Sequence, residues 1–178
     1  MFKILALGDS LTAGYGLAPE YSFASRLEKA LKHEGRKVRV INAGVSGDTT
    51  HDGLTRLKDL LRHRPDLVII QFGANDLYSG LSADQVRTNL VRMIDMSRSL
   101  GAEVLLAGIL CLITPDDPFS TSLHRAFKQA ARSCSVPLLE DFMPGIPGNP
   151  DLTLSDGIHP NERGVDKMVE NILPLILP

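Results

Sequence analysis

Five short apolar segments alternate with helical patterns along this chain, and this alternation constrains the fold more than any other feature of the sequence. The predicted strands are Phe2 to Leu7, Val38 to Ala43, Leu67 to Phe72, Val104 to Ile109 and Val136 to Leu139. The third is almost continuously apolar, as in a sheet covered on both faces. Strands that alternate with helices form parallel sheets with right-handed crossovers. The sequence therefore predicts the α/β class, as a flavodoxin-like three-layer α/β/α sandwich with a five-stranded parallel sheet.

Capping signals locate the helices between these strands. Ser22 is an N-cap candidate for a helix that ends near Glu34, and Ser82-Ala83-Asp84-Gln85 is a capping box for a helix that ends near Leu100. The other three helices are predicted from Thr49 or Thr50 to before Pro65, near Ser120 to Ser133, and from Pro160 onward. The first strand is expected to lead into a loop through Pro19, and a long loop is expected over Glu140 to Ser155.

Length and charge limit the classes of function. A chain of 178 residues is most simply one domain, residues 1–178. Its net charge of −2 gives no reason to expect nucleic acid or an anionic membrane as a partner. The longest apolar run, Val104 to Ile113, is too short to span a bilayer. Only four apolar residues separate Lys3 from Gly8, so we expect a cytoplasmic protein, or a periplasmic or secreted one whose leader has been removed.

Two cysteines, Cys111 and Cys134, are too few for a disulfide framework and lack metal-ligand spacing. We interpret both as buried, small apolar residues. No metal and no organic cofactor is expected.

The residues that could take part in catalysis or binding lie in four loops, and each loop follows a predicted strand. They are Gly8-Asp9-Ser10, Gly44-Val45-Ser46-Gly47-Asp48, Gly73-Ala74-Asn75-Asp76 and Asp156-Gly157-Ile158-His159. Each loop alone is also explained by ordinary turn chemistry, since glycine with Asp, Asn or Ser is typical of turns. Ligands of α/β sheets, however, bind at the carboxyl ends of the strands, where these loops would meet.

Together the four loops contain every group that acyl transfer requires. Ser10 is the candidate nucleophile, and His159 is a base able to take its proton. Asp156, three residues earlier, can accept the other ring N–H and fix the tautomer. The backbone N–H groups of Ser10 and Gly47, with the side-chain amide of Asn75, are candidates for an oxyanion hole.

These residues resemble the four signature blocks of the SGNH (GDSL) hydrolases, in the family's order and over nearly the whole chain. The segments Gly8 to Tyr15 and Asn42 to Thr49 are most similar to small bacterial arylesterases and to multifunctional thioesterase–lysophospholipases. The resemblance implies that Ser10, Gly47, Asn75 and His159 are the four namesake residues, and that Asp156 completes the triad. The loop from Leu110 to Pro118 departs from the Pro- and Asn-containing loop of relatives, which helps to form their acyl pocket.

The leading hypothesis is a serine hydrolase that cleaves carboxylic esters or thioesters of small to medium acyl chains, a small-molecule substrate. Ser46 is a weaker nucleophile candidate, because it lacks the second glycine of a nucleophile elbow. Two alternatives remain: a carbohydrate O-acetylesterase of the same family, and a non-catalytic flavodoxin-like binding module. The apolar loop residues that we expect to line an acyl groove are Leu11, Leu77, Tyr78, Leu110 and Ile113.

Overall fold

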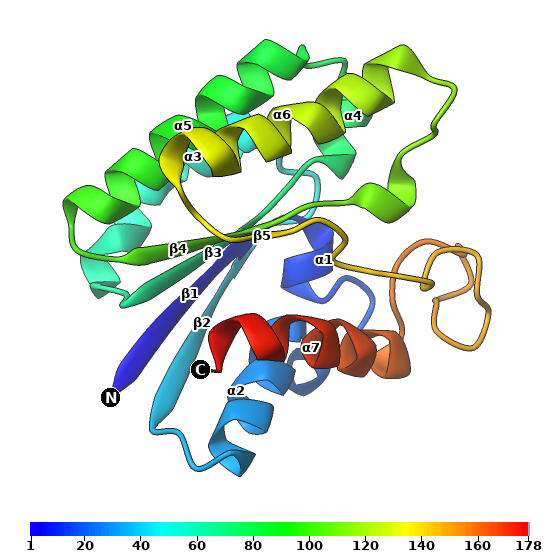
Figure 1. Cartoon of the computed structure of the whole chain (residues 1–178). Helices are drawn as coiled ribbons and strands as arrows, with labels where there is room; N and C mark the ends of the chain where they lie inside the picture. Colours follow the sequence, from blue (N-terminus) through cyan, green and yellow to red (C-terminus); the bar gives the residue numbers. More distant parts are fainter. Residues whose placement is uncertain (178) are drawn as a thin grey trace.

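The computed structural model describes residues 1–177, and within them five parallel strands form one sheet in the order β2-β1-β3-β4-β5 (Figure 1). The strands are β1 (Phe2–Gly8), β2 (Val38–Gly44), β3 (Leu67–Gln71), β4 (Glu103–Ala107) and β5 (Leu138–Leu139). The predicted α/β fold with a five-stranded parallel sheet is confirmed. All of β3 is buried, as its apolar sequence predicts for a sheet covered on both faces.

Strand β1 pairs with β2 on one side and with β3 on the other, and the register aligns their carboxyl ends. Gly8, the last residue of β1, lies opposite Gly44 of β2 and Gln71 of β3. The chain runs from β1 to β2 on one side and then crosses to β3 on the other side of β1, so the topological switch point lies between β1 and β3. The loops that follow the first three strands are therefore neighbours.

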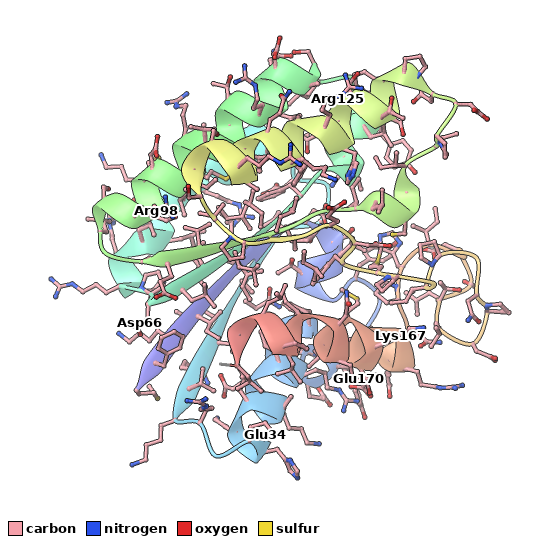
Figure 2. All side chains as sticks on the ribbon, in the orientation of Figure 1. Glu34, Asp66, Arg98, Arg125, Lys167 and Glu170 are labelled. Carbon is pink, nitrogen blue, oxygen red and sulfur yellow. The ribbon has the colours of Figure 1, made fainter. Side chains whose placement is uncertain are left out.

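Helices cover both faces of the sheet (Figure 1). One layer consists of α2 (Phe23–His33) and α7 (Glu162–Ile176), and the other of α3 (Thr50–Leu60), α5 (Ala83–Ser99) and α6 (Pro118–Cys134). Each presents an apolar face to the sheet, and Phe23 of α2 packs edge to face against Phe142, which follows β5, with ring centroids 4.8 Å apart. Charged side chains such as Glu34, Asp66 and Lys167 lie on the outside (Figure 2).

The predicted caps of three helices are confirmed. The side chain of Ser22 accepts a hydrogen bond from the backbone N–H of Ser25 at the start of α2. Ser82 and Gln85 form a reciprocal capping box at the start of α5, and Thr49, rather than Thr50, caps α3.

Several predicted boundaries were wrong, because local caps override the sequence pattern. The segment expected to be a loop through Pro19 contains α1 (Ser10–Ala13), capped by Asp9, and a 3₁₀ turn (Pro19–Tyr21). A further short helix, α4 (Ala74–Ser79), follows β3. Helix α7 begins after the N-cap Asn161 and not at Pro160, whereas α6 begins at Pro118, behind the side-chain cap of Asp117. Two further 3₁₀ turns follow α3 (Leu61–His63) and β4 (Leu110–Leu112).

Both cysteines are free and half-buried, not fully buried as expected. Burial raises the pKa of the Cys111 thiol, and the nearby Asp141 carboxyl adds to this effect. Within residues 1–177, the helices are too short or too polar to cross a membrane.

Candidate active site

Ser10 lies where β1 ends and α1 begins. The carboxylate of Asp9 accepts the backbone N–H of Leu11 at 3.0 Å and caps this short helix. Gly8 is required at the bend, because a Cβ there would lie 2.1 Å from the Thr12 hydroxyl and 2.7 Å from the Gln71 carbonyl oxygen. Ser10 is thereby held on a rigid turn and stays half-buried at the carboxyl edge of the sheet.

The structure places Ser10, His159 and Asp156 in one chain of hydrogen bonds, although 149 positions separate the serine from the histidine. The distance from Ser10 Oγ to His159 Nε2 is 3.0 Å, and that from His159 Nδ1 to Asp156 Oδ2 is 2.6 Å. The other oxygen of Asp156 accepts the backbone N–H groups of Ile158 and His159, each at 2.9 Å.

This arrangement determines which atoms carry protons. The backbone N–H of Ile158 is the strongest influence that lowers the pKa of Asp156, and the His159 side chain adds to it, so the carboxyl is ionised. A carboxylate beside Nδ1 requires a proton on that nitrogen. In the neutral imidazole, Nε2 is then free to accept the hydroxyl proton of Ser10.

Tyr15 lies against the imidazole on the outer side of the site. Its ring centroid is 4.5 Å from that of His159, with a tilt of 39° between the rings, and 52% of its surface is exposed. This contact was not predicted from the sequence. Its position five residues after the serine was visible, but no local pattern indicates packing against a residue so distant in the chain.

Gly47 lies on the loop that follows β2, and Asn75 lies in the first turn of α4, which follows β3; both segments are next to the end of β1, where Ser10 lies. Gly47 has a φ of +91°, and a Cβ built on it would meet no atom within 4 Å, so its backbone is open to approach. One N–H of the Asn75 amide donates to the backbone carbonyl of Asp48 at 2.9 Å. A primary amide has two N–H groups, so the second is available to a ligand.

A buried carboxylate holds the Asn75 segment in place. Asp76 accepts the backbone N–H of Thr50 at 3.0 Å and its hydroxyl at 2.6 Å, and Asn89 donates to the same hydroxyl at 3.0 Å. Burial raises the pKa of Asp76 against the effect of these hydrogen bonds. The contacts tie α4 to the amino end of α3 and, through Asn89, to α5.

The five residues expected to line an acyl groove lie in different environments. Leu11 is only 3% exposed and belongs to the hydrophobic core, because α1 turns it inward; it is therefore unavailable to a substrate. Leu77 and Ile113 are half-buried, whereas Tyr78 in α4 and Leu110 in the 3₁₀ turn after β4 are exposed.

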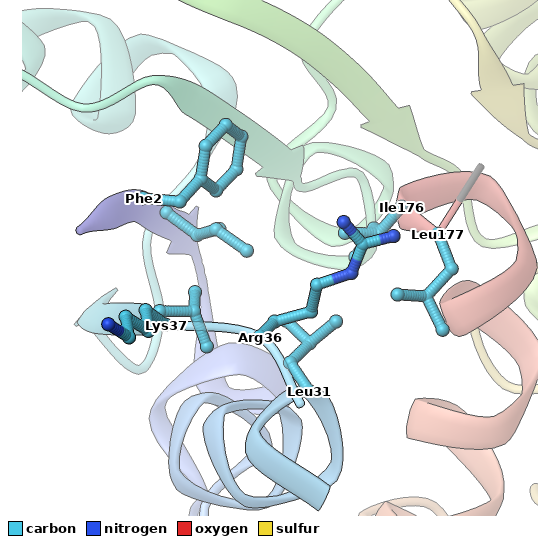
Figure 3. A pocket seen from close by; sticks show the side chains of 8 residues that line it. Phe2, Leu31, Arg36, Lys37, Ile176 and Leu177 are labelled. Carbon is cyan, nitrogen blue, oxygen red and sulfur yellow. The ribbon is translucent and has the colours of Figure 1, made fainter. Parts of the chain in front are cut away.

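A separate cavity of about 290 Å³ opens at the opposite end of the sheet (Figure 3). It is lined by Phe2, Ile4, Leu31, Arg36, Lys37, Val38, Ile176 and Leu177. Phe2 and Val38 begin strands whose far ends lead into the loops of Ser10 and Gly47. This cavity is therefore not part of the serine site.

A serine, a histidine and an aspartate in this hydrogen-bonded order, at the carboxyl edge of a parallel α/β sheet, define the serine hydrolase class. Residues 6–167 match the model of the GDSL-like Lipase/Acylhydrolase family. The chain belongs to this family and is a carboxylic ester hydrolase, as the sequence motifs predicted.

Known relatives agree with this assignment. The chain is 38% identical to the "Arylesterase" of Vibrio mimicus over 159 residues, 89% of this chain and 80% of the relative. It is 32% identical to "Thioesterase 1/protease 1/lysophospholipase L1" of Escherichia coli K12 over 178 residues, covering 97% and 84% of the two chains. The crystal structure of TesA superposes with a TM-score of 0.91 at 34% identity and covers 99% of this chain and 98% of that one.

Proposed function

We propose that this enzyme cleaves esters or thioesters of small to medium acyl chains through an acyl-enzyme on Ser10. The hydrogen-bonded series from Ser10 through His159 to Asp156 is the single observation that carries this proposal. It joins a nucleophile, a general base and the group that orients the base, in the order that acyl transfer requires.

In the first half-reaction, Ser10 Oγ attacks the carbonyl carbon of the substrate while His159 Nε2 takes the hydroxyl proton. The ionised Asp156 stabilises the imidazolium that forms. When the tetrahedral intermediate collapses, His159 returns this proton to the departing alcohol or thiol, which leaves the acyl group on Ser10. In the second half-reaction, water attacks the acyl carbon while His159 takes its proton, and His159 then returns this proton to Ser10 Oγ as the carboxylic acid is released.

The developing oxyanion would be bound by three donors: the backbone N–H groups of Ser10 and Gly47 and the free N–H of Asn75. Donors of this kind contribute about 3–4 kcal/mol each in comparable enzymes. The open backbone of Gly47 supports its role, since no side chain blocks the approach to its amide.

The substrate is proposed to be a small molecule with an apolar acyl group. Tyr78 in α4 and Leu110 in the 3₁₀ turn after β4 expose apolar surface, and Leu77 and Ile113 are half-buried in the same two segments. The names of the two curated relatives support both oxygen esters and thioesters as candidates. A carbohydrate O-acetylesterase is less well supported, because the chain has no Trp and only three Tyr for stacking on a sugar.

The replacement of Ser10 by alanine tests the proposed chemistry. Ser10→Ala should reduce hydrolysis of a medium-chain nitrophenyl ester to a trace, with an unchanged circular dichroism spectrum and unfolding midpoint. Substantial activity in this folded variant would mean that another residue is the nucleophile. Ser46→Ala is the matched control and should retain activity. An assay of the unsubstituted enzyme with acetylated xylan oligosaccharides, thioesters and nitrophenyl esters of several acyl lengths would decide the substrate class.

A further inference from the structure

Arg56 joins two of the loops that surround Ser10. It lies on α3, outside the four sequence blocks, and its side chain is 24% exposed. Its Nε donates to the Asp48 carboxylate at 2.7 Å, and its Nη2 donates to the backbone carbonyl of Gly8 at 3.0 Å. One guanidinium thus bonds to the loop after β2 and to the end of β1.

Each of these two contacts lies next to a group that is proposed to act in hydrolysis. Gly8 lies two residues before Ser10, and its carbonyl also accepts the N–H of Val45 at 3.0 Å. Asp48 follows Gly47 directly, and its N–H closes the turn around Gly47 by donating to the Val45 carbonyl at 3.2 Å. A shift of Arg56 would therefore move the surroundings of both the nucleophile and the Gly47 amide.

Arg56 also acts on the third loop, through Asp48. The backbone carbonyl of Asp48 accepts one N–H of the Asn75 amide at 2.9 Å. Because the amide group is planar, this bond sets the direction of the second N–H, the one proposed to bind the oxyanion. The side chain of Asp48 is held by Arg56, so the direction of the Asn75 donor depends on the guanidinium.

We propose that Arg56 is a positioning residue for hydrolysis: its guanidinium holds three loops so that Ser10, Gly47 and Asn75 converge on one carbonyl. The inference rests on the proposed function of those three groups. Lysine would not replace arginine here, because a single ammonium lacks the rigid fork that spans a carboxylate and a carbonyl at once.

This role is tested by measuring kcat and KM separately for Arg56→Lys and Arg56→Ala. Displacement of catalytic groups by about 1 Å costs on the order of 10²-fold in rate. We expect kcat to fall about 10- to 100-fold in both variants, while KM changes little because the acyl-binding surface is untouched. Added guanidinium should restore part of kcat to Arg56→Ala and none to Arg56→Lys.

Arg62→Lys is the matched control, because Arg62 also pairs with an aspartate, Asp59, but both side chains are more than 70% exposed. This variant should retain full kcat. Unfolding midpoints measured for all variants would identify any loss of kcat that comes from global destabilisation.

A double-mutant cycle with Asn75→Ala separates positioning from a purely structural role. Because Arg56 is proposed to position Asn75 together with Ser10 and Gly47, Arg56→Lys should cost less in kcat once Asn75 is removed. Equal losses in both backgrounds, or a kcat for Arg56→Lys within twofold of the unsubstituted enzyme, would overturn the inference. Failure of the proposed function can be distinguished from failure of this inference, because it would appear as residual activity in Ser10→Ala whatever residue is at position 56.

Discussion

The carboxyl group of Asp9 is fully buried one residue before Ser10. One of its oxygens accepts the N–H of Leu11, while the other has no hydrogen-bond partner among residues 1–177. Burial raises its pKa from 3.8 to about 6, although the Leu11 N–H acts in the opposite direction. The folded protein therefore holds this proton more tightly than the unfolded chain, and the carboxyl lowers stability as the pH rises from about 4 to about 6.

Asp9→Asn should remove this pH dependence, because asparagine keeps an acceptor for the Leu11 N–H but carries no charge. Compared with that of the unsubstituted protein, the free energy of unfolding of the variant should rise by about 2 kcal/mol between pH 4 and pH 8. Urea unfolding at the two pH values measures this difference. Asp59→Asn, which changes an exposed carboxylate, should show almost no such increase; equal behaviour of the two variants would contradict the assigned pKa of Asp9.

Individual residues differ in how far the sequence alone could reveal them. Ser10, Asp156 and His159 lie in recognisable blocks, so their proposed roles could be predicted before the structure was known. Arg56 and Tyr15 could not be predicted in this way. Arg56 contacts a backbone carbonyl, which no sequence pattern encodes, and Tyr15 packs against a histidine 144 positions away.

At the scale of single elements, α1 is the helix whose position matters most for the site. It spans only Ser10–Ala13, too short for a periodic apolar pattern, so the sequence predicted a loop. Its stability comes from the Asp9 cap, the left-handed Gly14 at its end and close packing against β2. A Cβ on Gly44 would lie 2.2 Å from the Ala13 nitrogen and 2.6 Å from its Cα.

Gly44→Ala should therefore displace α1 and separate Ser10 Oγ from His159 Nε2. We expect kcat to fall on the order of 10²-fold, with a loss of about 1–3 kcal/mol of stability from overpacking. Steady-state kinetics and urea unfolding measure the two effects. Gly108→Ala is the control: its Cβ would crowd the Glu140 carbonyl at 2.7 Å, away from α1, and should cost stability with a much smaller loss of kcat. Normal kcat in Gly44→Ala would show that the helix tolerates displacement.

For the whole molecule, the alternation of strands and helices was sufficient to predict the sheet and the edge at which the loops meet. It was not sufficient to predict the path of the segment that brings His159 back to Ser10. That path depends on backbone hydrogen bonds: Gly148 N–H to Gly157 O at 2.8 Å, Leu154 N–H to His159 O at 2.8 Å and Asn161 N–H to Leu152 O at 2.9 Å. Such bonds are made by atoms common to all residues, so residue types do not reveal them.

Covalent labelling with a fluorophosphonate tests most directly whether Ser10 is a nucleophile activated by His159. Intact mass and peptide mapping should show one adduct, on the peptide that contains Ser10, with none in Ser10→Ala and a greatly slowed reaction in His159→Ala. An adduct on Ser46 or another residue, or undiminished labelling in His159→Ala, would contradict the account.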